Sequence, residues 1–221
     1  EAVKSRYLPT EQKQNSAHIR LADYFETLEL FPLIKGGEGV VPHARKVDEL
    51  PWQLQQAKEW QRLYNLMSSL DFFKAVWTAD EFEVKTYWAR LEDNSLSKVD
   101  AYQPVLKSPD SCEDKNSVWC LATLLADTGN PKEAFLLREY LVNHYRKIGD
   151  VNNLQASLGN QALILYAWGM LDEAMKLHKE EEGICRELGN KDGLSYSLGN
   201  QANILYAWGR LDDARTLQKP E

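Results

Sequence analysis

The chain contains a long segment that is repeated forty residues later. Residues 157–179 read SLGNQALILYAWGMLDEAMKLHK, and residues 197–219 read SLGNQANILYAWGRLDDARTLQK. The two segments share 17 of 23 residues at one fixed offset. A match of this length predicts a repeat array, in which each copy is one supersecondary element that packs against its neighbours.

The apolar residues within each copy recur at helical spacing on both sides of a glycine. Before Gly169 they are Leu158, Ala162, Leu165, Ala167 and Trp168, and after it they are Leu171, Ala174, Leu177, Ile184 and Leu188. Gly189 follows the second stripe, where a left-handed glycine would cap the last turn. The pattern therefore predicts two helices joined by a tight turn.

A more divergent third copy precedes these two and has Gly129 at the position of Gly169. Small residues recur where two helices of a pair would cross closely; they are Ala122, Ala162 and Ala202 on the first helices, and Ala134, Ala174 and Ala214 on the second. The pattern resembles the tetratricopeptide repeat, in the longer form found in kinesin light chains. The resemblance covers residues 113–221 and implies an all-α, right-handed superhelix of antiparallel helix pairs, an α-solenoid.

Amphipathic patterns also predict helices in the N-terminal half, over residues 10–28, 43–69 and 80–92. Pro51 is expected in the first turn of a helix, and Thr78 to Glu81 are expected to form an N-terminal cap. The glycine-rich residues 36–39 lack the lysine and hydroxyl pattern of a phosphate-binding loop, so a surface connection is expected there.

The sequence RKVDELPWQLQQAKEWQRLYNLMSSLDFFKAVW, followed by a Tyr-Trp helix, carries a second resemblance. It is similar to the helical segment that joins the nucleotidase part of STAND-type signalling ATPases, such as nephrocystin-type proteins, to their C-terminal repeats. We therefore expect a helical region over residues 1–95, a connecting segment over 96–112 with a short helix, and repeats over about 113–152, 153–192 and 193–221, the last truncated. The chain is expected to be a fragment of a longer protein.

Composition narrows the possible partners. The formal net charge is −7 and no stripe of Lys and Arg is present, which argues against nucleic acid as a ligand. Three cysteines without metal-ligand spacing indicate neither a disulfide framework nor a zinc site, and Cys120 and Cys185 are expected to be buried thiols. The sequence contains no run of eighteen apolar residues, so it predicts no membrane span. A cytoplasmic protein without a cofactor or a metal is expected.

The first helices of stacked pairs line the concave face of a superhelix. The residues expected on this face are Asn160, Leu163, Tyr166 and Ala167, and, one copy later, Asn200, Asn203, Tyr206 and Ala207, with Tyr196 as a further aromatic contact. The resemblance to kinesin light chains implies that Asn160 and Asn200 hydrogen-bond the backbone of an extended peptide. Cys120 stands at this position in the divergent copy. The alternative is that both asparagines bond locally between helices and set the repeat spacing.

No catalytic arrangement is found, because the four histidines are scattered and Asp172-Glu173 and Asp212-Asp213 open helices. Trp168 and Trp208 are interpreted as packing residues at the turns. We expect a non-enzymatic module that binds a protein or peptide, or another part of its own polypeptide. The alternative is a sensor or regulatory arm of a STAND ATPase, acting by autoinhibition or oligomerisation. Because the last pair is truncated, Leu205, Leu211, Ala214 and Leu217 lack a covering repeat, and frayed residues or self-association are expected there.

Overall fold

The computed structural model describes residues 10–32 and 41–217, and every regular element in these ranges is helical. The chain divides into two compact units, Glu1–Pro104 and Val105–Glu221, which we call the N-terminal and the C-terminal unit. The all-helical prediction is therefore confirmed for the described residues. The expected glycine-rich loop at residues 36–39 lies outside them.

The N-terminal unit is built around a cluster of large buried side chains. Tyr102 donates a hydrogen bond from its hydroxyl to the Met67 carbonyl at 2.6 Å, and its ring contacts those of Phe73 and Trp88. Burial in this cluster raises the pKa of Tyr102. The helices of the unit are α2 (Glu11–Glu26), α3 (Ala44–Gln56), α4 (Trp60–Ser68), α5 (Leu70–Ala79), α6 (Glu81–Asp93) and α7 (Lys98–Ala101), and α8 (Gln103–Lys107) spans the division.

Side-chain caps begin two helices whose starts the sequence predicts, and the cap at Asp80 lies within the predicted cap segment Thr78 to Glu81. The Thr10 side chain accepts from the Lys13 N–H, and Asp80 accepts from the N–H groups of Phe82 and Glu83. The prediction for Pro51 is wrong, since this residue lies inside α3, more than one turn after Ala44. Leu50, Pro51 and Leu54 are all buried, and this packing holds the helix together across the proline.

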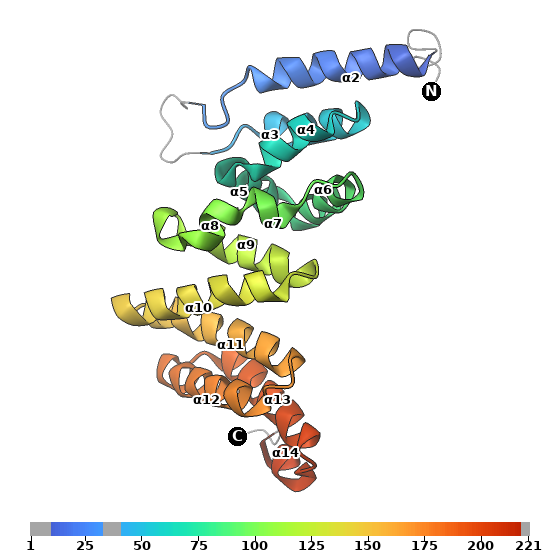
Figure 1. Cartoon of the computed structure of the whole chain (residues 1–221). Helices are drawn as coiled ribbons and strands as arrows, with labels where there is room; N and C mark the ends of the chain where they lie inside the picture. Colours follow the sequence, from blue (N-terminus) through green and yellow to red (C-terminus); the bar gives the residue numbers. More distant parts are fainter. Residues whose placement is uncertain (1–9, 33–40, 218–221) are drawn as a thin grey trace. The chain divides into compact units, whose positions relative to one another are not determined.

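The C-terminal unit consists of three helical hairpins (Figure 1). Hairpin 1 is α9 (Lys115–Asp127) with α10 (Pro131–Ile148), hairpin 2 is α11 (Val151–Ala167) with α12 (Leu171–Leu188), and hairpin 3 is α13 (Lys191–Ala207) with α14 (Leu211–Leu217). A short 3₁₀ turn, Pro109–Ser111, precedes them. From α9 to α14 each helix packs against the next one in the chain, and α11 also contacts α13.

A left-handed glycine ends each of the first five helices of this unit. Gly129, Gly149, Gly169, Gly189 and Gly209 have φ angles between +65° and +86°. They are twenty residues apart and alternate between the turns within hairpins and the turns between them. Because a side chain is strained at positive φ, these positions fix where each of these five helices ends.

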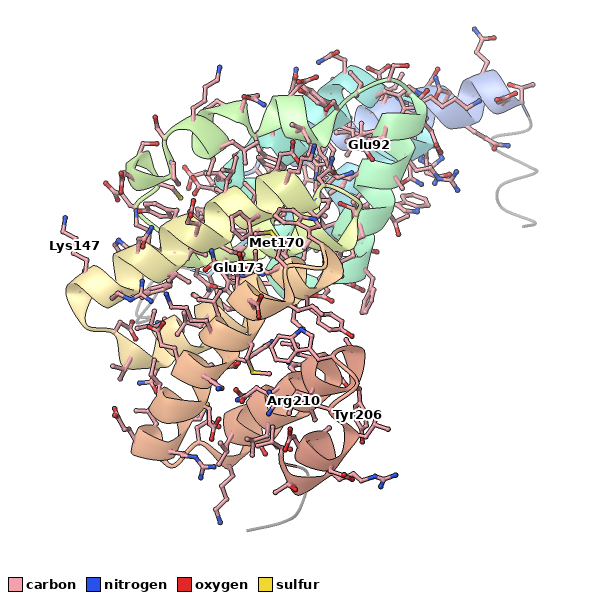
Figure 2. All side chains as sticks on the ribbon, turned by 60° about the horizontal axis from the view of Figure 1, so that its bottom comes forward. Glu92, Lys147, Met170, Glu173, Tyr206 and Arg210 are labelled. Carbon is pink, nitrogen blue, oxygen red and sulfur yellow. The ribbon has the colours of Figure 1, made fainter. Side chains whose placement is uncertain are left out.

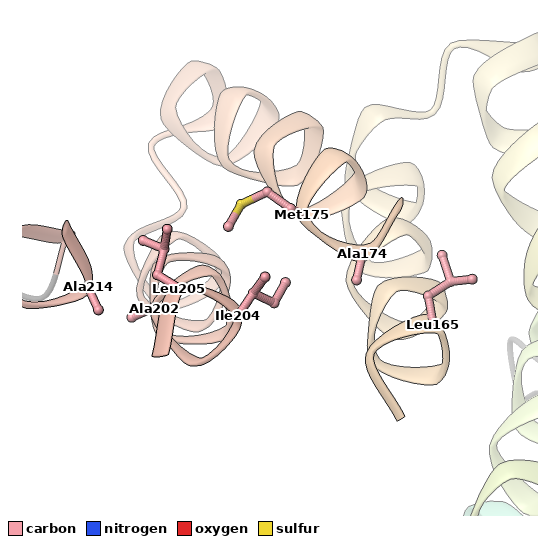
Figure 3. Close-up of a cluster of buried hydrophobic side chains, with 7 residues drawn as sticks. All are labelled: Leu165, Ala174, Met175, Ala202, Ile204, Leu205 and Ala214. Atoms are coloured by element: carbon pink, nitrogen blue, oxygen red, sulfur yellow. The ribbon is translucent and has the colours of Figure 1, made fainter. Parts of the chain in front are cut away.

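The hairpins pack through the small residues that the sequence singled out. All six repeated alanines are fully buried: Ala122, Ala134, Ala162, Ala174, Ala202 and Ala214. Figure 3 shows three of them, Ala174, Ala202 and Ala214, in one apolar cluster with Leu165, Met175, Ile204 and Leu205. This cluster extends from α11 through α12 and α13 to α14, so it joins hairpins 2 and 3 through a continuous core.

Candidate functional site

The residues predicted to bind a peptide lie on one side of α11 and one side of α13. On α11, Leu163 and Tyr166 are 46% and 39% exposed and Asn160 is half-buried. On α13, the exposed residues are Tyr196, Asn203 and Tyr206, and Asn200 is half-buried like Asn160. The two sets are forty residues apart on helices that contact each other, so they form two matching stripes, which we call the first-helix face.

Asn160 uses its side chain within its own helix. Its Nδ2 donates to the Ala156 carbonyl at 2.8 Å, one turn earlier in α11. This bond differs from the predicted local alternative, in which the asparagines would link neighbouring helices. An asparagine amide has two N–H donors and an acceptor oxygen, so this bond takes up one of the donors.

An open hollow of about 700 Å³ brings three of the predicted residues together on α13. They are Tyr196, Asn200 and Asn203, and the remaining lining residues are Asp192, Ser195 and Gly199. Leu163, Tyr166 and Tyr206 are not among the lining residues. Every lining residue is on α13, and Asp192 is the one with a charge, so the hollow offers mainly amide, hydroxyl and aromatic groups.

Part of this hollow corresponds to a covered surface in hairpin 2. Gln155 and Gly159 stand forty residues before Ser195 and Gly199, and both are buried. A carboxylate oxygen of Glu181, from α12, lies 2.5 Å from where a Cβ on Gly159 would be. A Cβ on Gly199 would meet nothing within 4 Å. The Ser195 and Gly199 side of the hollow therefore corresponds to the surface of α11 that packs against α12 in hairpin 2, while Asn200 and Asn203 belong to the first-helix face.

The turns within the hairpins carry exposed aromatic residues beside this face. Tyr206 lies near the end of α13, close to the turn with Arg210 (Figure 2). Trp168 packs on Phe135 of the preceding hairpin with 5.1 Å between ring centroids, and it remains 39% exposed. Packing of Trp168 at the turn agrees with its interpretation from the sequence.

The residues expected to be exposed at the last hairpin are only partly so. Ala214 is fully buried and Leu205 is 6% exposed, since α12, α13 and α14 cover both within the core cluster. Leu211 is 50% exposed. The expectation of uncovered side chains is thus wrong for Leu205 and Ala214, because α14 packs back on α13.

Sequence reasoning missed a buried polar network in hairpin 2. His178 was one of four scattered histidines, but its ring lies inside the structure, with Nδ1 2.9 Å from Glu181 Oε2. The three-residue spacing of this pair on a helix is a signal that the sequence did contain.

Cys120 and Cys185 are buried, as predicted, and burial raises the pKa of the Cys185 thiol to about 11, with the charges of Glu181 and Glu182 adding to the effect.

Neither a metal site nor a membrane-spanning helix is found in the part of the chain that the structure describes. Within residues 10–32 and 41–217, His, Cys, Asp and Glu form no group of three or more that could hold a metal ion. Among the helices in the same ranges, none has the length and apolar character needed to cross a membrane.

Comparison with known proteins gives one distant relative. The chain is 26% identical over 191 residues to nephrocystin-3 of Homo sapiens, and the match covers 81% of the chain and 14% of that protein. No family model matches the chain. The matched length exceeds that of the C-terminal unit, so the similarity includes residues of both units.

Proposed function

We propose that the C-terminal unit is a tetratricopeptide-like α-solenoid, a right-handed superhelix whose first-helix face binds an extended segment of a protein partner. The observation that carries this proposal is the pair of matching, uncharged stripes on α11 and α13. The binding is non-catalytic and takes place in the cytoplasm. It needs no cofactor.

The chemistry of the stripes suits an unfolded polypeptide. An asparagine side chain offers both donors and an acceptor, which matches the alternating N–H and C=O groups of an extended chain. Tyr166 and Tyr206 are each about two-fifths exposed, so part of each ring is held by the protein and part is free for contact. Rigid aromatic groups of this kind supply contact area at a low entropic cost.

The distant similarity to nephrocystin-3 supports a role as an interaction scaffold in general terms. The chain spans 14% of the length of that relative, so the partner and the activity of the whole protein are further proposals. The partner is a protein or peptide, or another part of the same polypeptide.

A peptide-display screen with the full chain tests the proposal. We expect it to select extended, weakly charged sequences, and we expect Asn160→Ala and Asn200→Ala to weaken their binding about tenfold each, the effect of about 1.4 kcal/mol for one lost polar contact. Asn143→Ala is the matched control, because Asn143 is exposed on the second helix of hairpin 1. Ligands whose affinity is the same for all three variants would contradict the proposal.

A second candidate is a sensor or regulatory arm of a STAND ATPase, which the sequence resemblance of the N-terminal half suggests; the similarity to nephrocystin-3 also extends into the N-terminal unit. Such an arm would act by autoinhibition or oligomerisation, without a peptide ligand. Binding to a separately produced nucleotidase part, together with an empty peptide screen, would favour this candidate. Sedimentation equilibrium of the full chain would detect self-association, and a single monomeric species would argue against oligomerisation.

A further inference from the structure

Hairpins 1 and 2 share a pairing problem that their buried polar residues address. Hairpin 1 has buried alanines at the same crossing points as hairpin 2, with Ala122 and Ala134 in place of Ala162 and Ala174. Apolar packing alone would therefore distinguish poorly between a helix and its equivalent forty residues away. We propose that two different buried polar clusters, one in hairpin 1 and one in hairpin 2, select the pairing of α10 with α9 and of α12 with α11 within their own hairpins.

The first cluster joins α10 to α9 through Arg138. This side chain is 2% exposed, its guanidinium lies 4.2 Å from the centroid of the Trp119 ring, and its Nη2 donates to Thr123 Oγ1 at 2.6 Å. Burial lowers the pKa of Arg138 to about 10, and the charge of Asp127 opposes the effect. A buried guanidinium depends on the partners that it has, so α10 requires a ring and a hydroxyl at these places on its neighbour.

The second cluster joins α12 to α11 through Glu181. This carboxylate is 4% exposed and accepts hydrogen bonds at 3.0 Å from Gln155 Nε2 and at 2.9 Å from His178 Nδ1. It occupies the space left by the missing side chain of Gly159, where a Cβ would lie 2.5 Å from Oε1. Gln155 also accepts from Asn190 Nδ2, and Asn190 caps α13. The cluster therefore links all three helices.

The two clusters occupy equivalent positions with incompatible residues. Trp119 corresponds to Gly159, and Thr123 corresponds to Leu163. On the second helices, Arg138 corresponds to His178, and the buried Leu141 corresponds to Glu181.

Exchanged partners would fail in two ways. With α9 in place of α11, Glu181 would meet the Trp119 indole where it now finds a glycine. With α11 in place of α9, Arg138 would face Gly159 and Leu163, which provide neither a ring nor a hydroxyl. Both exchanges leave a charge buried without its partners, which is among the most costly defects in a protein interior.

Exchange of the two clusters within the full chain tests the proposal. One variant gives α12 the residues of α10 (His178→Arg with Glu181→Leu), a second gives α11 the residues of α9 (Gly159→Trp with Leu163→Thr), and a third combines them. In urea unfolding, we expect the folding equilibrium constant of the first and of the second variant to be at least tenfold lower than that of the unaltered chain. The folding equilibrium constant of the combined variant should be at least tenfold higher than the product of the two separate effects predicts. Additive effects would overturn the proposal.

A milder cycle keeps the test decisive if the mismatched variants do not fold. Gly159→Ala alone should strongly lower the folding equilibrium constant. In a Glu181→Ala background the same substitution should lower this constant by a factor at least ten times smaller, because the Cβ then has space. The same penalty in both backgrounds would overturn the proposal. Gly183→Asn exchanges an exposed residue of α12 for its equivalent in α10, and it should leave folding unchanged within threefold.

Discussion

At the scale of single residues, two glycines at equivalent places have opposite roles. Gly159 makes room for the Glu181 carboxylate, whereas a Cβ on Gly199 would meet open space. The two residues lie in the same SLGNQA sequence, so nothing local distinguishes them. The difference comes entirely from what α12 places beside one of them.

This difference predicts opposite outcomes for the same substitution. Gly159→Ala should lower the free energy of unfolding by about 1–3 kcal/mol, the usual cost of overpacking a well-filled site. Gly199→Ala should raise it by about 0.5–1 kcal/mol, because alanine is the better helix former. Thermal or urea unfolding measures both, and equal effects of the two substitutions would show that the close contact at Gly159 is absent.

Cys185 predicts a dependence of stability on alkaline pH. Burial raises the pKa of its thiol from 9.0 to about 11, so the folded state holds the proton more tightly than the unfolded state. The resulting stabilisation is complete below pH 9 and is lost as the pH rises through about 11.

Between pH 9 and about 11, the free energy of unfolding should fall less steeply with pH in Cys185→Ala than in the unaltered chain. In the native protein at pH 8, a thiol reagent should modify the partly exposed Cys112 before Cys185. Faster labelling of Cys185 would contradict its burial.

At the scale of helices, capping groups mark the start and the end of the first helices in hairpins 2 and 3. Asp150 accepts from the Asn153 N–H at the start of α11, and hydrogen bonds from Asn153 lower the pKa of this carboxyl group. Asn190 has the same place at the start of α13 and accepts from the Gly193 N–H. Each of these first helices begins with a polar cap, and a left-handed glycine follows the last turn of the helix.

The turn glycines therefore predict a second matched pair of substitutions. Gly169→Ala places a side chain at φ +77° and should lower the free energy of unfolding by about 1–2 kcal/mol. Gly183→Ala, inside α12 with open space around its Cβ, should be neutral or stabilising. Unfolding curves of the two variants provide the check, and a destabilised Gly183→Ala with a tolerated Gly169→Ala would contradict the assigned helix ends.

The elements of the repeats were predictable because their signals are local. In the sequence itself, Gly169 and Gly189 indicate where helices end, and the repeated alanines indicate where helices cross. Pro51 was misplaced because the burial of its neighbours, which is not a local property, allows it inside α3. The half-burial of Asn160 and its bond to Ala156 depend on the rotation of α11, which periodicity alone leaves open.

At the scale of the whole molecule, each unit has its own core. In the N-terminal unit the core includes Trp88 and Tyr102, and in the C-terminal unit it includes Leu165 and Ala202. Division into residues 1–104 and 105–221 separates these two cores.

We therefore expect a fragment of residues 105–221 to fold by itself. Circular dichroism should show a helical spectrum, and urea should unfold the fragment cooperatively. A fragment without a cooperative transition would show that the C-terminal unit depends on the rest of the chain. Fragment 1–104 serves as the companion measurement.

The full buried network could not have been foreseen from residue type, because glutamine and glutamate, as at Gln155 and Glu181, are mostly exposed in proteins. Gln155 on α11 meets Glu181 of α12, twenty-six residues later in the chain, and Asn190, thirty-five residues later, at the start of α13. The repeat itself was evident from the sequence, and the contacts that its differing residues make were evident only from the structure.

The regular placement of the left-handed glycines has a consequence for how such a protein can change. Recombination between two nearly identical stretches would delete or add forty residues and keep the reading frame. Each resulting junction would still join a helix to a helix of matching length, with a glycine at the bend. The number of hairpins can therefore vary between descendants of one ancestral gene without the redesign of any single turn.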